Sequence, residues 1–469
     1  MSIVTDTDLR ARLAGVADIG ATGLTVHDEA AVRGPLMDDL VFEAVFNEDA
    51  ALRDAARWVI WSASQALGAG SASIHELYRA RGRGEVPATA FTVPAINVRA
   101  AAYLTARQAF AAALERDAGT VIFEIAKSEM AYTDQRPAEY SAVILAAALR
   151  EGWRAPVFLQ GDHFQFNATK WAADPGAEMV GLRDLTREAI GGGFWNIDID
   201  SSTLVDLSQP SVADQQRVNA ENTAELTRFI RSLQPDGVTI SVGGEIGEVG
   251  KENSNEAELR AYLDGYRREL EGRAKGATGL SKVSVQTGTS HGGVPLPGGG
   301  VAQVKLEFDV LKRLGEVARK EYGLAGAVQH GASTLPDELF HRFPAVETAE
   351  IHLATGFQNL LYEHPAFPKD LLKRIEAWCQ ENAADERKPG QTEEQFVYTT
   401  RKKAIGPFKR ELWDLETKDE ILAAQRRKVA FLFTELAVNG SRDLVELYIQ
   451  PVELHRPLPD ALRSAVAAR

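Results

Sequence analysis

Between residues 91 and 356, eight short runs rich in Val, Ile and Phe alternate with longer segments of helical periodicity. Runs of this kind predict strands, and the helices between them predict parallel pairing, because parallel strands need a crossover connection. Eight such units predict a (β/α)8 barrel; an open doubly wound sheet is the alternative, but it does not usually carry polar residues at the ends of all its strands. The predicted strands are 91–98, 119–126, 155–163, 194–202, 237–247, 282–290, 326–333 and 349–356.

The segments on either side of this region have helical patterns. Residues 1–88 are a predicted helical N-terminal extension, residues 89–360 the barrel, and residues 361–469 a mostly helical C-terminal extension. This division accounts for a chain of 469 residues, which exceeds one ordinary domain. We expect the extensions to cover the barrel bottom or to form a subunit interface, and the sequence leaves both open.

The charge balance restricts the partners. A formal charge of −14 and a pI near 5.3 argue against nucleic acid and anionic membranes, since both need a basic protein surface. No apolar stretch approaches the roughly 18 residues that span a bilayer, and the acidic N-terminal segment lacks the pattern of a signal peptide. The single cysteine, Cys379, excludes an internal disulfide framework. The prediction is a cytoplasmic protein with a small-molecule substrate.

Three histidines follow predicted strands. His163 ends the third strand, His291 follows the sixth, and His330 lies near the end of the seventh. A single histidine at a strand end is more often structural, but three from strands separated by whole helices favour a metal site. Zinc or another divalent cation is the predicted cofactor, with a monovalent cation as a further candidate.

Polar residues end all eight predicted strands, and a barrel directs such residues toward one centre at its carboxyl end. Beside the histidines, these residues form the candidate site for proton transfer and substrate binding. They are Asn97, Glu124 with Lys127 and Ser128, Asp162, Asp200 with Ser201, Glu245, Ser333, and His352 with Thr355.

At these strand ends the chain resembles the class II, metal-dependent fructose-bisphosphate aldolases. The resemblance covers roughly residues 90–360 and five short motifs in the family's order. The motifs are Asp162-His163, Asp200 in DIDSS, Glu245-Ile246-Gly247, Gly288 to Gly292 around His291, and His330-Gly331-Ala332-Ser333. The chain also looks similar to the large accessory subunits of tagatose-bisphosphate aldolase.

The resemblance implies a role for each motif. His163, His291 and His330 would hold the ion, which stabilises the enediolate formed in retro-aldol cleavage. Asp162 would take the C4 hydroxyl proton, with a partner that orients a metal-ligating histidine as the alternative. Glu245 would support an alternative metal position and is the second candidate for the base. Asp200 would orient a ligand, bind a second cation or touch substrate.

Part of the family's anion-binding pattern is missing. The family continues His-Gly-x-Tyr-Lys after the sixth strand, where this chain has His291-Gly-Gly-Val-Pro295, and its Asn-x-Asp-Thr after the eighth strand is His352-Leu-Ala-Thr355 here. Gly292, Gly331 and Ser333 remain as substrate-binding candidates, together with Asn97, His352 and Thr355. The missing positive charge is expected from Lys127 or from the basic stretch 399–410, with the second reaching a neighbouring subunit of a homo-oligomer as an alternative.

Three functions remain open from the sequence. The first is a metal-dependent aldolase acting on a ketose phosphate or a related sugar. The second is a sugar epimerase or isomerase on the same fold, and the third is a noncatalytic accessory subunit of an aldolase. Because the lysine after His291 is absent, fructose 1,6-bisphosphate is expected to be a poor substrate.

Overall fold

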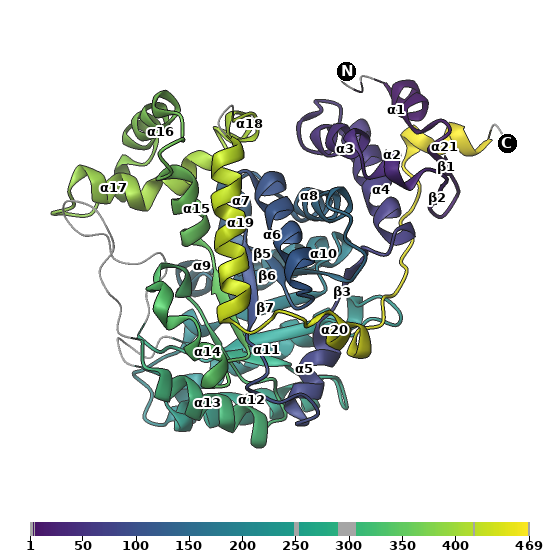
Figure 1. Ribbon diagram of the computed structural model, residues 1–469. Helices are drawn as coiled ribbons and strands as arrows, with labels where there is room; N and C mark the ends of the chain where they lie inside the picture. Colours follow the sequence, from purple (N-terminus) through teal and green to yellow (C-terminus); the bar gives the residue numbers. More distant parts are fainter. Residues whose placement is uncertain (1–2, 4, 248–252, 289–305, 416–417, 468–469) are drawn as a thin grey trace.

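A closed parallel barrel forms the centre of the molecule (Figure 1). The computed structural model describes residues 3, 5–247, 253–288, 306–415 and 418–467. Each of the eight strands is hydrogen-bonded to its two neighbours, and the pairing of β6 with β7 closes the ring. The predicted (β/α)8 fold is confirmed. The barrel strands are β4 (Val93–Asn97), β5 (Ile122–Ala126), β6 (Val157–Gln165), β7 (Asn196–Asp200), β8 (Ser241–Glu245), β9 (Lys282–Ser284), β10 (Ala327–Gln329) and β11 (Glu350–Leu353).

Helices surround this ring and bury the outer face of the strands, so that face is apolar, whereas polar and charged side chains such as Glu124, Lys282 and Glu350 are buried inside the barrel. Six of these helices are long, and between them lie the short helices α7 (Lys127–Tyr132), α9 (Ala168–Ala173) and α14 (Arg342–Ala345). The long helices are α6 (Ala102–Arg116), α8 (Pro137–Arg150), α10 (Pro175–Gly191), α11 (Val212–Leu233), α12 (Glu256–Arg273) and α13 (Phe308–Lys320).

The N-terminal extension contains strands that the helical patterns did not predict. The hairpin of β1 (Ala17–Ile19) and β2 (Leu24–Val26) follows α1, and the two-residue strand β3 (Ser71–Ala72) pairs with the start of β6. Segments of two or three residues are too short for alternation to reveal them. The helices are α1 (Asp6–Leu13), α2 (Glu29–Val32), α3 (Pro35–Phe46), α4 (Ala50–Ala66) and α5 (His75–Gly82).

Helix α5 covers the amino end of the barrel. Arg81 on this helix is 1% exposed, and its terminal nitrogens donate to four backbone carbonyls. Two of these carbonyls, those of Ala88 and Phe91, precede the first barrel strand, and the other two, those of Glu347 and Thr348, precede the last. The guanidinium therefore joins the entry to β4 and the entry to β11 at the floor of the barrel.

The C-terminal extension packs over the barrel in two parts. Apolar residues of this extension between Leu361 and Ile421 form a separate core, which includes Phe367, Ile375, Cys379 and Phe396. Helix α19 lies along the barrel helix α6, as Figure 1 shows. The helices are α15 (Thr355–Tyr362), which follows β11, then α16 (Lys369–Asn382), α17 (Glu393–Thr400), α18 (Lys409–Trp413), α19 (Lys418–Glu435), α20 (Arg442–Tyr448) and α21 (Asp460–Ala467), with a 3-10 segment, η5 (Arg401–Ile405).

The two ends of the chain lie side by side in Figure 1, where α21 contacts α1 and α4. Trp58 and Trp61 of α4 donate their indole N–H groups to the carbonyls of Arg456 and Leu454, at 3.0 and 2.8 Å. The guanidinium of Arg456 stacks on the Trp61 ring, 3.5 Å from its centroid. Within the described ranges, every helix is too short or too polar to cross a lipid bilayer.

Candidate active site

An irregularity in β6 positions the Asp162–His163 pair. The register between β6 and β7 shifts between Gly161 and Phe164, so the intervening residues form a bulge, and His163 has a φ of +42°. Gly161 is required here, because a Cβ at this position would lie 2.5 Å from the Phe164 ring. Bulges of this kind redirect side chains next to active sites, and a positive φ at a non-glycine residue carries strain. The strand continues to Gln165, beyond the predicted end at His163.

Three carboxylates surround the His163 imidazole. Its Nδ1 lies 3.0 Å from Asp200 Oδ2 and 3.4 Å from Glu245 Oε2, and its Nε2 lies 3.8 Å from Asp162 Oδ1. Burial disfavours the imidazolium, but these carboxylates, Asp162 foremost, raise the pKa of His163 well above its usual value. The three acidic groups come from β6, β7 and β8, and together they make a pocket that attracts a cation.

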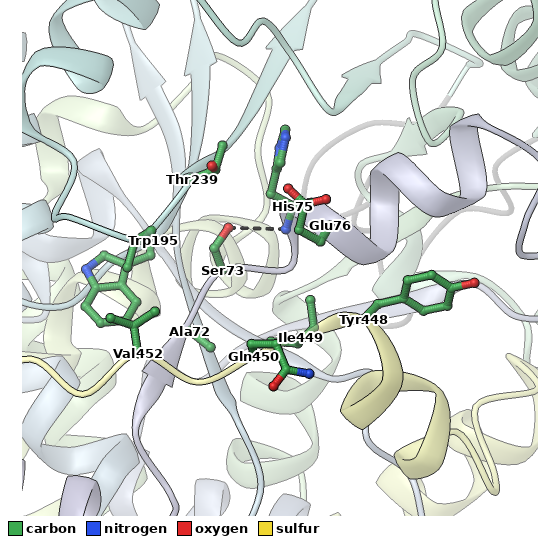
Figure 2. A pocket seen from close by; sticks show the side chains of 12 residues that line it. Ala72, Ser73, His75, Glu76, Trp195, Thr239, Tyr448, Ile449, Gln450 and Val452 are labelled. Carbon is green, nitrogen blue, oxygen red and sulfur yellow. Dashed lines mark hydrogen bonds between the residues drawn. The ribbon is translucent and has the colours of Figure 1, made fainter.

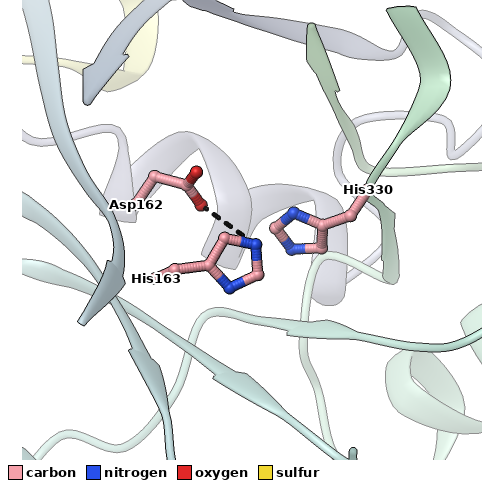
Figure 3. Close-up of side chains that lie close together, drawn as sticks. All are labelled: Asp162, His163 and His330. Atoms are coloured by element: carbon pink, nitrogen blue, oxygen red, sulfur yellow. Dashed lines mark ion pairs between the residues drawn. The ribbon is translucent and has the colours of Figure 1, made fainter. Parts of the chain in front are cut away.

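His330 faces the same centre from the next residue after β10. Its ring centroid lies 4.3 Å from that of His163, and its Nε2 lies 3.0 Å from the Ser284 hydroxyl. Figure 3 shows Asp162, His163 and His330 pointing toward one another from two sides of the barrel. One ligand atom from each lies within 4.8 Å of the others, which is the spacing of groups that share one metal ion.

His352 lies deeper in the barrel, against four carboxylates from different strands. Its Nδ1 is 2.9 Å from Glu124 Oε2 and 3.2 Å from Asp162 Oδ1, and its Nε2 is 2.8 Å from Glu350 Oε1. Asp198 Oδ2 lies 3.7 Å from the same Nε2. Despite burial, Glu124 and Asp162 raise the pKa of His352 well above its usual value. The ring also contacts His330, with centroids 4.0 Å apart.

A buried lysine supports this layer from below. Lys282 at the start of β9 is 1% exposed, and its Nζ lies 2.5 Å from Glu350 Oε1 and 2.9 Å from Asp198 Oδ2. It also donates to Gln160 Oε1 at 2.8 Å. Burial raises the pKa of a carboxyl, but the Lys282 ammonium outweighs this effect and lowers the pKa of Glu350 to about 2. The lysine therefore holds Glu350 ionised beside His352.

Two carboxyls nearer the site have raised pKa values. Burial, and then the negative charge of Asp200, raise the pKa of Glu245 to about 7. Burial is also the main cause that raises the pKa of Glu124 to about 8, with Asp162 adding to the effect. Groups that exchange protons near neutral pH are typical of sites for proton transfer.

A cavity of about 880 Å³, a volume that includes its open mouth, lies at the carboxyl end of the barrel. Its lining includes Asp162, His163, His330 and His352, together with the carboxylates Glu124 and Glu129. Hydroxyls and two cations line it as well, and they are supplied by Ser128, Tyr132, Ser333, Thr355, Arg99 and Lys402. The cavity is large enough for a small sugar derivative.

Most of the predicted substrate-binding residues lie at this cavity. Gly331, Ser333, His352 and Thr355 line it, and Gly331 has the positive φ of +67° that glycine allows. Asn97 is buried behind it and donates to the Glu129 carboxylate. His291 and Gly292 lie outside the described residues, so their predicted roles as third ligand and substrate contact stay predictions.

The two predicted sources of positive charge differ in the structure. Lys127 does not line the cavity; it donates to the carbonyl of Gln165 at 2.7 Å and pairs with Glu178 at 3.1 Å. The basic stretch 399–410 supplies Lys402 to the cavity of its own chain. Arg99 was missed, although it follows the predicted strand end by one residue. Lys402 had no comparable signal, because strand-end reasoning does not apply to the extension.

A second cavity lies at the amino end of the barrel and differs in chemistry (Figure 2). It is lined by residues of the β3–α5 segment, by Trp195 and by α20 with the residues after it. His75 and Glu76 are its only histidine and carboxylate, and the His75 backbone N–H donates to Ser73 Oγ at 3.2 Å. Burial is the main cause that lowers the pKa of His75 to about 3. None of the His, Asp and Glu groups described above lines this cavity.

Solved structures with this fold include sugar-metabolising proteins. The fructuronate-tagaturonate epimerase UxaE from Cohnella laeviribosi, in complex with one glycerol, aligns with a TM-score of 0.54 and 10% identity over 84% of this chain and 89% of its own. A probable tagatose 6 phosphate kinase from Sinorhizobium meliloti 1021 aligns with a TM-score of 0.51 and 19% identity over 80% of this chain and 97% of its own. At these identities the likeness shows the fold alone.

The sequence comparisons identify the family. No curated protein sequence matches this chain significantly. The family model described as fructose-bisphosphate aldolase class-II matches residues 85–411, which is more than half of the 469 residues. The resemblance seen in the strand-end motifs is therefore confirmed, and the chain belongs to the class II fructose-bisphosphate aldolase family.

Proposed function

We propose that the protein is a divalent-metal-dependent aldolase that cleaves or forms a C–C bond in a ketose phosphate or a related sugar. The observation that carries the proposal is the convergence of Asp162, His163 and His330 at the mouth of the barrel. Membership of the class II aldolase family supports it. Neighbouring carboxyls with pKa values near neutral, such as Glu245, support a site that moves protons.

The residues fit a divalent cation. His163 and His330 offer imidazole nitrogens, and Asp162, Asp200 and Glu245 surround His163 with negative charge. Zinc prefers such a mixture of nitrogen and oxygen ligands. His163 and His330 would hold the ion, with His291 as the third ligand and Glu245 or Asp200 as alternatives. When bound, it supplies the positive charge that stabilises the enediolate left on the ketose fragment.

Proton transfer falls to the side chains of the chain itself. Asp162 accepts the C4 hydroxyl proton as the C–C bond breaks, and returns it in the reverse direction. His352, 3.2 Å from Asp162 Oδ1 and 2.8 Å from Glu350 Oε1, orients this carboxylate. Glu245 is the alternative base. Gly331, Ser333 and Thr355 bind the substrate in the same cavity, with His352, Asn97 and Gly292 as further candidates.

A C4 epimerase is the second candidate. The UxaE structure, whose printed function is the epimerisation of fructuronate and tagaturonate, shares the fold. Cleavage, rotation of the aldehyde and re-addition would give an epimer with the same base and metal. A noncatalytic accessory subunit is disfavoured, because such a subunit has no need for Asp162, His163 and His330 in one cavity.

The test is a product assay on a panel of ketoses, phosphorylated, acidic and neutral. Coupled enzymes detect the triose or aldehyde products, and NMR detects an epimer. Release of two fragments supports the aldolase, and a C4 epimer without release supports the epimerase. His330→Ala is the control. Because His330 lies just beyond β10, its replacement should remove the metal without unfolding the barrel, and zinc content and thermal stability measure these two properties.

Substrate preference provides a second test of the proposed function. Fructose 1,6-bisphosphate should have a lower kcat/KM than other ketose phosphates or acidic ketoses, because the family's lysine and its Asn-x-Asp are absent. A wide preference for fructose 1,6-bisphosphate would contradict this expectation. The cytoplasmic location and the homo-oligomeric assembly belong to the proposal as well, and size-exclusion chromatography with light scattering measures the assembly.

A further inference from the structure

Two cations face the cavity from different parts of the chain. Arg99 lies two residues beyond β4, and its side chain is only 4% exposed. Lys402 lies in η5, within the C-terminal extension. Both line the cavity that also contains Asp162, His163 and His330. An element outside the barrel therefore contributes to the lining of this cavity.

Contacts on both sides fix the segment that carries Lys402. Arg401, on one side, donates to Asn359 Oδ1 at 2.7 Å and to Glu363 of α15 at 2.5 Å. On the other side, the Gly406 N–H donates to the Tyr132 carbonyl at 3.1 Å. A Cβ at position 406 would lie 2.6 Å from this oxygen, so only glycine allows the approach. Lys402 is thus held at the cavity by the side-chain contacts of Arg401 and the backbone contact of Gly406.

The charges on this side do not balance. Arg99 lies 3.3 Å from the Glu129 carboxylate, which also accepts hydrogen bonds from Asn97 and from the Ala126 N–H. Lys402 lies over the Tyr132 ring, 5.9 Å from its centroid, and within the described ranges it forms no ion pair with a carboxylate. Glu129 is thus the carboxylate that faces both cations, and one positive charge is in excess among these three groups. An anionic group of a ligand would balance it.

Hydroxyl groups accompany the two cations. Arg99 contacts Tyr132 OH at 3.1 Å and Thr355 Oγ1 at 3.2 Å, so these oxygens lie where the guanidinium ends. Ser128 and Ser333 line the same cavity. Guanidinium, ammonium and hydroxyl groups in one place form the donor set that binds an oxyanion.

We propose that Arg99 and Lys402 form the subsite that binds the anionic end of the sugar, a terminal phosphate or carboxylate. This inference rests on the proposed function for the choice of a sugar as the ligand. In this proposal Lys402, a residue of the C-terminal extension, supplies the positive charge of the lysine that the family carries after the sixth strand. The preferred substrate is then an acidic ketose derivative whose charged end binds Arg99 and Lys402 in the cavity that also contains the Asp162 base.

Binding of unreactive sugar analogues tests the subsite without requiring any reaction. Isothermal titration calorimetry on the whole protein compares sorbitol, sorbitol 6-phosphate and gluconate, none of which has the ketone or aldehyde group that aldol cleavage requires. At least one of the two anions should bind more tightly than sorbitol, and the anion that does identifies the source of the charge. Lys402→Met should weaken this anion roughly 10–150-fold and leave sorbitol unchanged.

Lys403→Met is the matched control, since the neighbouring lysine pairs with Glu386 and does not line the cavity. Lys402→Arg should retain most of the anion preference. Equal binding of sorbitol and both anions, or an unchanged preference in Lys402→Met, would overturn the subsite. Anion binding that depends on Lys402 in a protein that cleaves no ketose would uphold the subsite and refute the proposed reaction.

Discussion

Each end of the barrel buries an arginine, and the partners of these two arginines show which one supports the fold and which one faces the candidate site. Arg81 at the amino end donates to four backbone carbonyls, all of which belong to the segments that enter β4 and β11. Arg99 at the carboxyl end contacts two hydroxyls and a carboxylate, and its side chain faces the large cavity. Both are nearly inaccessible to solvent.

Burial of a charge therefore does not identify a site by itself. At the amino end the partners are neutral carbonyls fixed by the backbone, so the charge closes the barrel. At the carboxyl end the partners are side chains that a ligand can share, and a second cation, Lys402, lies nearby. What distinguishes the two regions is the kind of partner and the presence of a cavity.

The largest effect is expected from Asp162→Asn at the carboxyl end. The amide cannot accept the proton, so turnover on a confirmed substrate should fall roughly 10²–10⁴-fold. Steady-state kinetics measure this change, and zinc content and melting temperature should match the unmodified protein. Near-normal turnover would show that Asp162 is not the base, and Glu245→Gln would then be the next variant.

Lys282→Met tests the layer between the two ends. Removal of the ammonium leaves Glu350 and Asp198 as buried carboxylates that share only His352 as a cation within the described residues, which should lower the free energy of unfolding by about 3–5 kcal/mol. Urea denaturation measures the loss, with Lys403→Met as a lysine control. A loss within the error of the extrapolation would mean that the buried network contributes little to the barrel.

His75→Gln tests how the buried histidine at the amino end makes stability depend on pH. Because the pKa of His75 is lowered to about 3, the folded protein keeps it neutral while the unfolded chain binds a proton below about pH 6.5. The contribution of the neutral, buried His75 to the free energy of unfolding is fully present above that pH and is lost as the pH falls toward 3. Between pH 7 and pH 5 this loss amounts to about 2 kcal/mol. The variant should lack this part of the slope, and parallel slopes would contradict the assignment.

The smallest effect on stability is expected from Lys402→Met. The lysine is half-buried and forms no ion pair in the described residues, so the free energy of unfolding should change by less than about 0.5 kcal/mol. A destabilisation as large as that of Lys282→Met would place Lys402 among the structural charges instead. Thermal and urea unfolding of the two variants under identical conditions give this comparison.

The sequence predicted the barrel well, and it also predicted which strand-end residues come together at its carboxyl end. Apolar runs between helices locate all eight strands, and residues such as Asp162, His163 and His330 follow from their place at strand ends. This works because closure of the ring directs these side chains to one centre. The bulge that gives His163 its positive φ has no local signal, since it depends on the pairing of β6 with β7.

The contacts of His352 and the position of Lys402 were predicted less well. His352 was expected to contact the substrate; it does line the cavity, but it also lies against Glu124, Asp162 and Glu350, which come from three strands. Contacts of this kind depend on the radius of the barrel and on rotamers, which spacing in the sequence does not reveal. Lys402 enters the cavity through the packing of the extension, for which no pattern existed.

The joining of the two chain ends has a consequence for biosynthesis. The indole N–H groups of Trp58 and Trp61 bind carbonyls at positions 456 and 454, nearly four hundred residues later. A ribosome delivers the N-terminal helices first, and these partners emerge only after all eight barrel strands have been synthesised. Until then the two indole N–H groups bind water, so the contacts of helix α4 with residues 454 and 456 form after the barrel segment has left the ribosome.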